Sequence, residues 1–314
     1  MGKYTKRPFS NDEVAVHVMS RVVQKRFLLD EAGMAEMRRI LRTQAEFAGL
    51  DVITFCFLKN HFHILIHVDS KPAREEVTDL ELLRRFRALY GGKRSPSLGV
   101  DADALKKSLE EDGERAETLR RQLKARMGHI PVFMRELKTR FTFWYNANYK
   151  TVGTFWAERY RSVLLEPGSP AVKAVAAYID LNAVRAGLAE TPQSYRYCGL
   201  GEAAIGQSPA RLGYQWLNRR RQGKGHQEIP PGDVFAEYVA YVERILARLH
   251  RTRTDAAKAP QAPDRVEEAA AAYPKQTSVP GSVEWVGKLI QTDGLLSFLS
   301  KRKHKAIQTV LNRC

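Results

Sequence analysis

The spacing of apolar residues along the chain predicts a sheet covered by helices. Short stretches that are apolar or alternate between apolar and polar residues indicate β-strands. They lie at 14–21, 52–58, 61–68 and 163–166. Stretches 30–48 and 171–182 predict helices, and we expect both to cover one face of the sheet. The pattern therefore predicts the α/β fold class, and it leaves the order of the strands open.

A charge-rich stretch in the middle of the chain is predicted to be a helical insertion. It runs from about 71 to 127 and is divided by a Gly- and Pro-containing break at 91–99. One helix is expected at 79–90 and another at 102–126. The insertion would separate the strand at 61–68 from the aromatic segment that follows.

The C-terminal third is predicted to be an extension, a linker and a tail. The helical extension covers 201–251 and contains an amphipathic helix at 233–250. The linker at 252–281 is rich in Ala, Pro and charged residues, with one short helix expected at 266–272. Residues 282–314 are expected to form a small basic helical tail.

Two histidines bracket one apolar residue in the strand at 61–68. Because side chains alternate along a strand, His61 and His63 should share one side, while Phe62, Ile64 and Ile66 face the other and pack on a core. Two adjacent imidazoles supply half of a metal site. The alternative is that they are two polar residues on a half-exposed sheet face.

The class of histidine-triad nucleotide hydrolases fits this strand poorly. That class needs a third alternating histidine, and Leu65 stands at the required position. His67 comes two residues later, and we interpret it as a strand-end residue.

The helix predicted at 171–182 carries a tyrosine and an asparagine four residues apart. This spacing would place Tyr178 and Asn182 on one face of the helix, where both could point at a neighbouring sheet. The alternative is that the tyrosine packs as an amphipathic core residue and the asparagine caps the helix end. Pro170 suits the first turn of this helix.

The charge balance favours a nucleic-acid partner. The chain has 51 Lys plus Arg against 35 Asp plus Glu, a formal net charge of +16, and such an excess attracts phosphate backbones. One basic segment is also aromatic and could stack unpaired bases. Its residues are Phe155, Trp156, Arg159, Tyr160 and Arg161. The alternative is that Phe155 and Trp156 belong to the core and the arginines are solvated.

The order of these motifs resembles one family. A strand His-apolar-His, the basic aromatic segment, Tyr178 with Asn182, and the run from Asn182 to Leu188 follow one another as in the IS200-like single-tyrosine HUH transposases, and more closely in their REP-associated tyrosine transposase branch. The similarity extends from the strand at 14–21 to residues 192–195. Residues 1–200 would then form the transposase domain, with the insertion inside it.

The resemblance implies a fold and a site. The fold is a ferredoxin-like HUH core, in which helices cover an antiparallel sheet. His61, His63 and Asn182 would hold a divalent cation, Mg²⁺ or Mn²⁺, and Tyr178 would be the nucleophile that forms a covalent 5′-phosphotyrosine. The expected partner is single-stranded DNA with a hairpin, in the cytoplasm of a prokaryote. Monomeric and homodimeric forms both remain open.

The match has two small departures. Arg185 and Gly187 fit the family's Asn-Pro-x-Arg-Ala-Gly pattern, whereas Ala183 replaces its proline. Leu58 and Lys59 stand where relatives carry Met-Pro. We expect Arg185, with the two arginines of the aromatic segment, to contact nucleic acid.

Tyr160 is a rival nucleophile because it also lies among basic residues. Its surroundings indicate a strand, whereas Tyr178 lies on a predicted helix with Asn182 at ligand spacing, so we favour Tyr178.

Three functions remain open: a strand-transferring enzyme, a domesticated DNA-binding or regulatory protein that no longer transposes, and an RNA-binding or RNA-processing protein. The three cysteines lack disulfide-framework spacing, and no apolar run is long enough to span a bilayer. Both observations favour a protein of the reducing cytoplasm.

Overall fold

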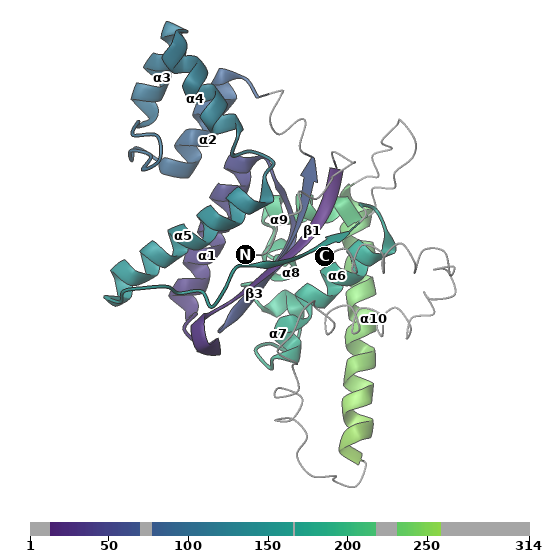
Figure 1. Ribbon diagram of the computed structural model, residues 1–314. Helices are drawn as coiled ribbons and strands as arrows, with labels where there is room; N and C mark the ends of the chain where they lie inside the picture. Colours follow the sequence, from purple (N-terminus) through teal and green to yellow (C-terminus); the bar gives the residue numbers. More distant parts are fainter. Residues whose placement is uncertain (1–12, 70–76, 166, 218–230, 259–314) are drawn as a thin grey trace, which may run out of the picture.

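The computed structural model describes residues 13–69, 77–165, 167–217 and 231–258 (Figure 1). At its centre is a four-stranded sheet of order β2-β3-β1-β4, in which all neighbouring strands are antiparallel. The strands are β1 (Glu13–Arg21), β2 (Asp51–Leu58), β3 (His61–Asp69) and β4 (Arg161–Leu165). The four predicted strands are confirmed, and β4 begins two residues earlier than expected.

Two helices complete a ferredoxin-like arrangement. Helix α1 (Glu31–Ala48) connects β1 to β2, and α5 (Ile130–Tyr149) is the last helix between β3 and β4. With β3 placed between β1 and β2, and β1 placed between β3 and β4, the core is a split β-α-β-β-α-β unit. The predicted α/β class with an antiparallel sheet and helical layers is therefore confirmed.

Strand register determines which residues share a face. His63 is paired with Met19 on one side and with Cys56 on the other, so these three side chains lie on one face of the sheet. Phe62 and Ile64 point to the opposite face and are fully buried, as predicted. We call the two faces the histidine face and the phenylalanine face.

The two helices predicted to share a face lie on opposite faces. The guanidinium of Arg42, on α1, lies 5.4 Å from the ring centre of Phe55, which is paired with Ile64 on the phenylalanine face. On the histidine face, Asp180 of α6 (Pro170–Asp180) accepts a hydrogen bond from the Thr54 hydroxyl on β2. The expectation of one shared face was wrong because helical patterns show which stripe of a helix is apolar, and not which side of a sheet it meets.

The helix ends follow from local sequence. Asp30 caps α1 by accepting a hydrogen bond from the Gly33 N–H at 2.8 Å, and Gly49 ends it with a φ of 61°. Pro170 occupies the first turn of α6, as predicted.

Short segments complete the core region: α7 (Asn182–Arg185) and the 3-10 turns at Val23–Lys25, Pro192–Ser194 and Gln215–Leu217.

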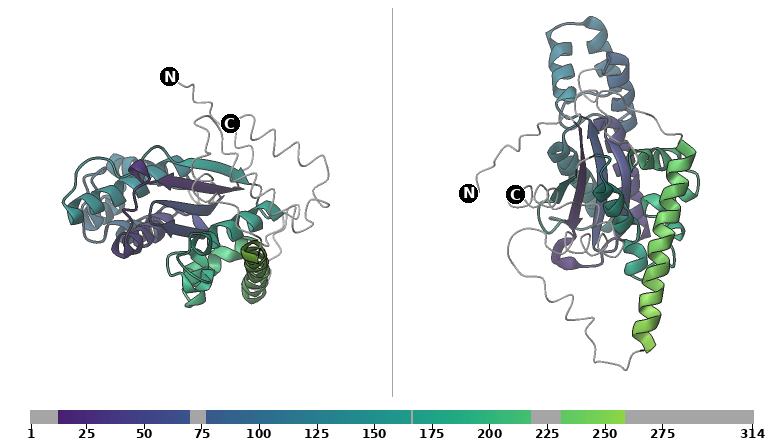
Figure 2. Two further views of the ribbon diagram at one scale, coloured as in Figure 1. Left: turned by 90° about the horizontal axis from the view of Figure 1, so that it is seen from below. Right: turned by 90° about the vertical axis from the view of Figure 1, so that its right-hand side faces the viewer.

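The insertion forms three helices that project from one end of the sheet (Figures 1 and 2). They are α2 (Asp79–Tyr90), α3 (Ala102–Glu111) and α4 (Glu114–Lys124), packed on their own apolar cluster, to which α1 contributes Phe47. The helix predicted at 79–90 is confirmed. The single helix predicted at 102–126 is wrong, because Asp112 adopts a left-handed conformation and the extended Gly113 begins a new helix.

The C-terminal helices lie on the same side of the sheet as the histidine face. They are α8 (Gly199–Ala204), α9 (Ser208–Tyr214) and α10 (Pro231–Lys258). The predicted helix at 233–250 is confirmed but continues to Lys258, so the linker expected from 252 begins as helix. The remainder of the predicted linker, its short helix at 266–272 and the tail at 282–314 lie outside the described residues.

Within the described ranges, no helix is both apolar enough and long enough to cross a bilayer. Cys56 and Cys198 are buried thiols on neighbouring backbone segments.

Candidate active site

Three histidines meet on the histidine face. His61 and His63 are on β3, with ring centres 5.2 Å apart. His17 on β1 places its Nε2 3.0 Å from Nδ1 of His63. Nδ1 of His61 lies 2.6 Å from the Oδ1 of Asn60. Both histidines of β3 are thus held through Nδ1, which leaves Nε2 as the atom that can bind a ligand.

The surroundings keep these imidazoles neutral. Burial, with a smaller effect of Arg21, lowers the pKa of His61 to about 4. Burial also lowers the pKa of His63 well below its usual value, and the nearby His17, His61 and arginines add to this. Burial lowers the pKa of His17 to about 4. A neutral imidazole has the lone pair that a metal ion requires.

Tyr178 projects from α6 onto the same histidines. Its ring centre lies 5.5 Å from that of His63 and 6.3 Å from that of His17, both in edge-on orientation. The guanidinium carbon of Arg185 lies 5.5 Å from the centre of the Tyr178 ring. The structure therefore brings together the predicted nucleophile, one predicted metal ligand and one predicted nucleic-acid contact.

Asn182 begins α7, directly beyond Leu181 at the end of α6. The hydrogen bond from the Arg185 N–H to the Leu181 carbonyl continues the helical pattern across this junction. The Asn182 side chain is buried, and its Nδ2 has no hydrogen-bond partner in the structure. No hydrogen bond to this Nδ2 has to be broken for the amide oxygen to bind a cation, so this residue fits the predicted role of a neutral ligand.

The donor set differs from common metal clusters. Among the residues that the structure describes, no group of three or more His, Cys, Asp or Glu side chains is placed to hold a metal. The predicted set of two imidazoles and one amide suits an exchangeable cation better than a permanently bound one.

Asp180 is a site residue that sequence reasoning missed. It lies on α6 between Tyr178 and Asn182, is completely buried, and accepts hydrogen bonds from four groups. These are Thr54 Oγ1 at 2.6 Å, the Leu200 N–H at 3.2 Å, Tyr214 at 3.0 Å and Tyr238 at 2.5 Å. Burial raises its pKa to about 6. The carboxylate fixes α6 to β2 and to the C-terminal helices.

His17 was also missed as a site residue. It was predicted only as part of the first strand, and its relation to His63 depends on the pairing of β1 with β3. The pairing places His17 opposite Leu65, the position diagonal to His63 on the same face. One inward-facing histidine in a strand indicates a site residue only when the neighbouring strand in the sheet is known.

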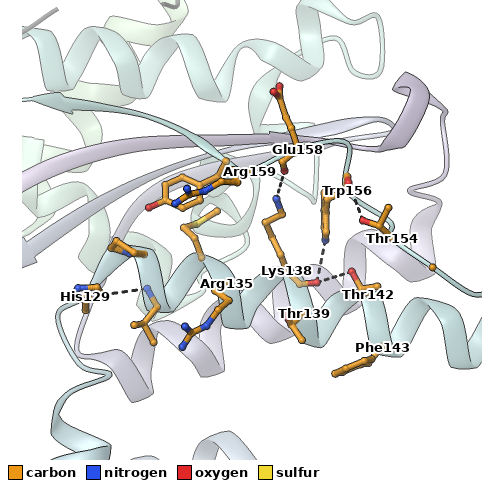
Figure 3. Close-up of a pocket in the computed structure, with 15 residues that line it drawn as sticks. His129, Arg135, Lys138, Thr139, Thr142, Phe143, Thr154, Trp156, Glu158 and Arg159 are labelled. Atoms are coloured by element: carbon orange, nitrogen blue, oxygen red, sulfur yellow. Dashed lines mark hydrogen bonds between the residues drawn. The ribbon is translucent and has the colours of Figure 1, made fainter. Parts of the chain in front are cut away.

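The two arginines of the aromatic segment have different positions. Arg161 is paired with Met19, which is paired with His63, so Arg161 lies on the histidine face. Its guanidinium is 3.1 Å from the Glu158 carboxylate. Arg159 instead lines a groove beside α5 (Figure 3), so the structure does not bring it to the histidines.

The aromatic residues divide between core and groove. Phe155 and Trp156 are buried, and the Trp156 ring packs edge-on against Phe62 at 5.2 Å. The alternative that both belong to the core is confirmed. Tyr160, the rival nucleophile, lines the same groove as Arg159 and precedes β4.

His67 has a structural place. Its ring stacks on Trp216 with centres 3.3 Å apart, and its Nε2 is 2.9 Å from the Glu13 carboxylate. It lies near the end of β3, as interpreted from the sequence.

No known family model matches the sequence, and no curated protein matches it. Seven chains of solved structures do match. One of them is the structure of a REP-associated tyrosine transposase bound to a REP hairpin, which is 11% identical. The alignment covers 73% of this chain and 99% of that chain, with a TM-score of 0.39. At this level of similarity, a function for this chain has to be argued from its own side chains.

Proposed function

We propose that this protein is a metal-dependent enzyme that cleaves and rejoins single-stranded DNA at hairpin-marked sites. Tyr178 is the nucleophile, and the intermediate is a covalent 5′-phosphotyrosine. The observation that carries the proposal is the edge-on contact between the rings of Tyr178 and His63 at 5.5 Å. It joins, on two different elements, the two residue types that the sequence resemblance assigns to this chemistry.

The side chains present fit a divalent cation. His61 and His63 are neutral and have Nε2 available, and Asn182 has an uncommitted buried amide. These three would hold the ion, Mg²⁺ or Mn²⁺. When bound, it would supply Lewis-acid activation of the scissile phosphate.

Tyr178 performs the bond exchange. Its hydroxyl oxygen attacks phosphorus and forms the O–P bond, while the bond from phosphorus to the 3′ oxygen breaks. The phenolic proton passes to solvent, and the leaving oxygen takes up a proton to become a 3′-hydroxyl. A second 3′-hydroxyl can reverse the exchange and join strands, so no ATP is needed.

Arg185 stabilises charge during this step. An unperturbed phenol has a pKa of about 10, so negative charge must develop on oxygen as the attack proceeds. The guanidinium 5.5 Å from the Tyr178 ring favours that charge and the nearby phosphate. Arg161 also lies on the histidine face, two strands away from His63, and extends the positive surface toward the DNA backbone.

The domain division belongs to the same proposal. We assign residues 1–200 to the catalytic domain, interrupted by the helical insertion, and residues 201–251 to a helical extension. The formal net charge of +16 supports a nucleic-acid partner for the whole chain.

The test is a denaturing gel of purified protein with labelled single-stranded hairpin DNA. Wild type should give a protein-linked DNA band that requires Mg²⁺ or Mn²⁺, and Tyr178→Phe should lose the band while still binding the hairpin. Tyr160→Phe is the matched control and should keep the band. Strand transfer by Tyr178→Phe would contradict the mechanism. Binding without any adduct would instead favour a domesticated DNA-binding protein, and equal binding of RNA hairpins would favour the RNA alternative.

A further inference from the structure

A groove runs between α5 and the segment that leads into β4 (Figure 3). Its volume is about 790 Å³, within the range of pockets that hold organic ligands. Helix α5 forms one wall and residues 153–160 form the other. It lies on the phenylalanine-face side of the β4 edge, because α5 packs there through Phe141 and Trp156.

Aromatic and cationic groups line this groove together. Phe143 of α5 lies at the outer rim of the groove, where its ring projects away from residues 153–160 (Figure 3) and is 70% exposed, open to stacking. Arg135 and Lys138 lie on the same helix, and Arg159 comes from the facing segment. The Lys138 ammonium donates to the Glu158 carbonyl at 2.6 Å and sits 5.7 Å from the Trp156 ring centre.

These groups match an unpaired nucleotide. Aromatic rings stack on bases of any sequence, and nearby cations bind the phosphates between them. The one acidic side chain that lines the groove, Glu158, has its carboxylate 3.1 Å from Arg161. The balance of charge in the groove is therefore positive.

The groove is close to the proposed active site along the backbone. The Ala157 N–H donates to the Arg21 carbonyl at 3.0 Å, and Arg21 is paired with His61. Arg161 continues the same path, two strands from His63. Two strand spacings amount to about 10 Å, so a strand whose phosphate lies at the histidines can pass Arg161 and round the short edge strand.

We propose that this groove binds unpaired nucleotides that flank the DNA hairpin, with Phe143 as the stacking platform and Arg135 and Arg159 as phosphate contacts. The inference rests on the proposed function for the identity of the strand. It adds a second single-stranded contact outside the site of Tyr178, on a helix that the sequence motifs do not include.

The experiment measures fluorescence anisotropy with full-length protein and two labelled DNA hairpins. One hairpin is blunt, and the other carries an unpaired extension of about six nucleotides, tested at either end. Wild type should bind the extended hairpin more tightly. Phe143→Ala should weaken binding of the extended hairpin about tenfold and leave the blunt one unchanged. Arg135→Ala should weaken it less and reduce its dependence on salt.

Matched controls come from the insertion. Leu80 on α2 is 79% exposed, and Arg115 on α4 is exposed, so Leu80→Ala and Arg115→Ala remove similar groups elsewhere. Both should bind the extended hairpin as wild type does. Equal binding of the two hairpins by wild type would overturn the inference, as would a Phe143→Ala protein that behaves like Leu80→Ala.

The adduct assay separates this inference from the proposed function. If wild type forms the covalent band and Phe143→Ala binds normally, the groove is not a nucleotide site although the enzyme proposal stands. If wild type forms no band but loses its preference for the extension in Phe143→Ala, the groove inference stands and the enzyme proposal fails.

Discussion

The Nε2 of His17 lies 3.0 Å from the Nδ1 of His63, across the pairing of β1 with β3. For His63 to bind a ligand through Nε2, its Nδ1 must carry the proton. This N–H then donates a hydrogen bond to the Nε2 of His17. In the proposed site, His17 would thus fix both the tautomer and the ring orientation of His63, as second partners of metal-binding histidines commonly do.

Substitution of His17 should weaken metal-dependent cleavage without affecting hairpin binding. Loss of such a partner typically costs about 10- to 100-fold in metal affinity or activity, so His17→Ala should need more Mn²⁺ to reach half-maximal adduct formation. A metal titration of the adduct band checks this. His67→Ala is the control, because His67 stacks on Trp216 and should leave the metal dependence unchanged. An unchanged titration for His17→Ala would refute the role.

Removal of the metal or of its imidazole ligands should abolish cleavage. A chelator should eliminate the covalent band, and added Mg²⁺ or Mn²⁺ should restore it. His61→Ala and His63→Ala should abolish the band with little loss of hairpin affinity. Asn182→Ala should be milder because it removes one neutral ligand of three. Adduct formation that persists in chelator would exclude the proposed metal.

Arg185 should contribute to the rate more than to binding. Arg185→Ala removes the guanidinium beside the Tyr178 ring, and we expect adduct formation to slow by about 10-fold or more, as for loss of a charge-stabilising donor. Arg185→Lys should retain part of the rate. Single-turnover kinetics at saturating DNA separate this effect from affinity, and a purely affinity-based loss would count against the assigned role.

Asp180 should be important for stability. Asp180→Ala leaves the buried hydroxyls of Tyr214 and Tyr238 without their acceptor, so we expect the free energy of unfolding to fall by about 2–4 kcal/mol. Tyr238→Phe removes one hydrogen bond and should cost about 1 kcal/mol. Urea denaturation provides the measurement. Equal stability of Asp180→Ala and wild type would contradict the buried network.

The stability contribution of Asp180 should depend on pH. Burial raises its pKa from 3.8 to about 6, so the folded protein binds this proton more tightly than the unfolded chain does. The resulting stabilisation is complete below pH 3.8 and is lost as the pH rises through about 6. Relative to Asp180→Asn, wild type should therefore gain unfolding free energy as the pH is lowered from neutral. A constant difference across that window would disprove the shift.

The sequence predicted the strands well because their short apolar runs are bounded by turn residues. It also predicted that His61 and His63 share a face, since this depends only on alternation along one strand. Helix α5 was not predicted, although its buried residues Phe133, Leu137, Phe141 and Tyr145 have helical spacing. The break at Asp112 was missed because a left-handed residue leaves no gap in the charge pattern.

The remaining site residues depend on contacts between distant segments. His17 and His63 are 46 residues apart, and Asp180 and Tyr238 are 58 apart. Neither pair follows from periodicity, since the first depends on the strand order and the second on the packing of α10. Arg159 and Arg161 looked equivalent in sequence. In the structure Arg161 begins β4 and lies on the histidine face, whereas Arg159 precedes β4 and lines the groove beside α5.

The hydrogen bond from Tyr238 to Asp180 also affects the order in which the chain matures during translation. The ribosome releases the sheet and α6 long before residue 238 emerges, so the nascent domain contains a buried carboxylate whose last donor has not yet been synthesised. Until α10 docks, Asp180 of α6 has only the donors that precede α10 in the chain, from Thr54, Leu200 and Tyr214. The helix that carries Tyr178 would thus gain its last buried hydrogen bond near the end of synthesis.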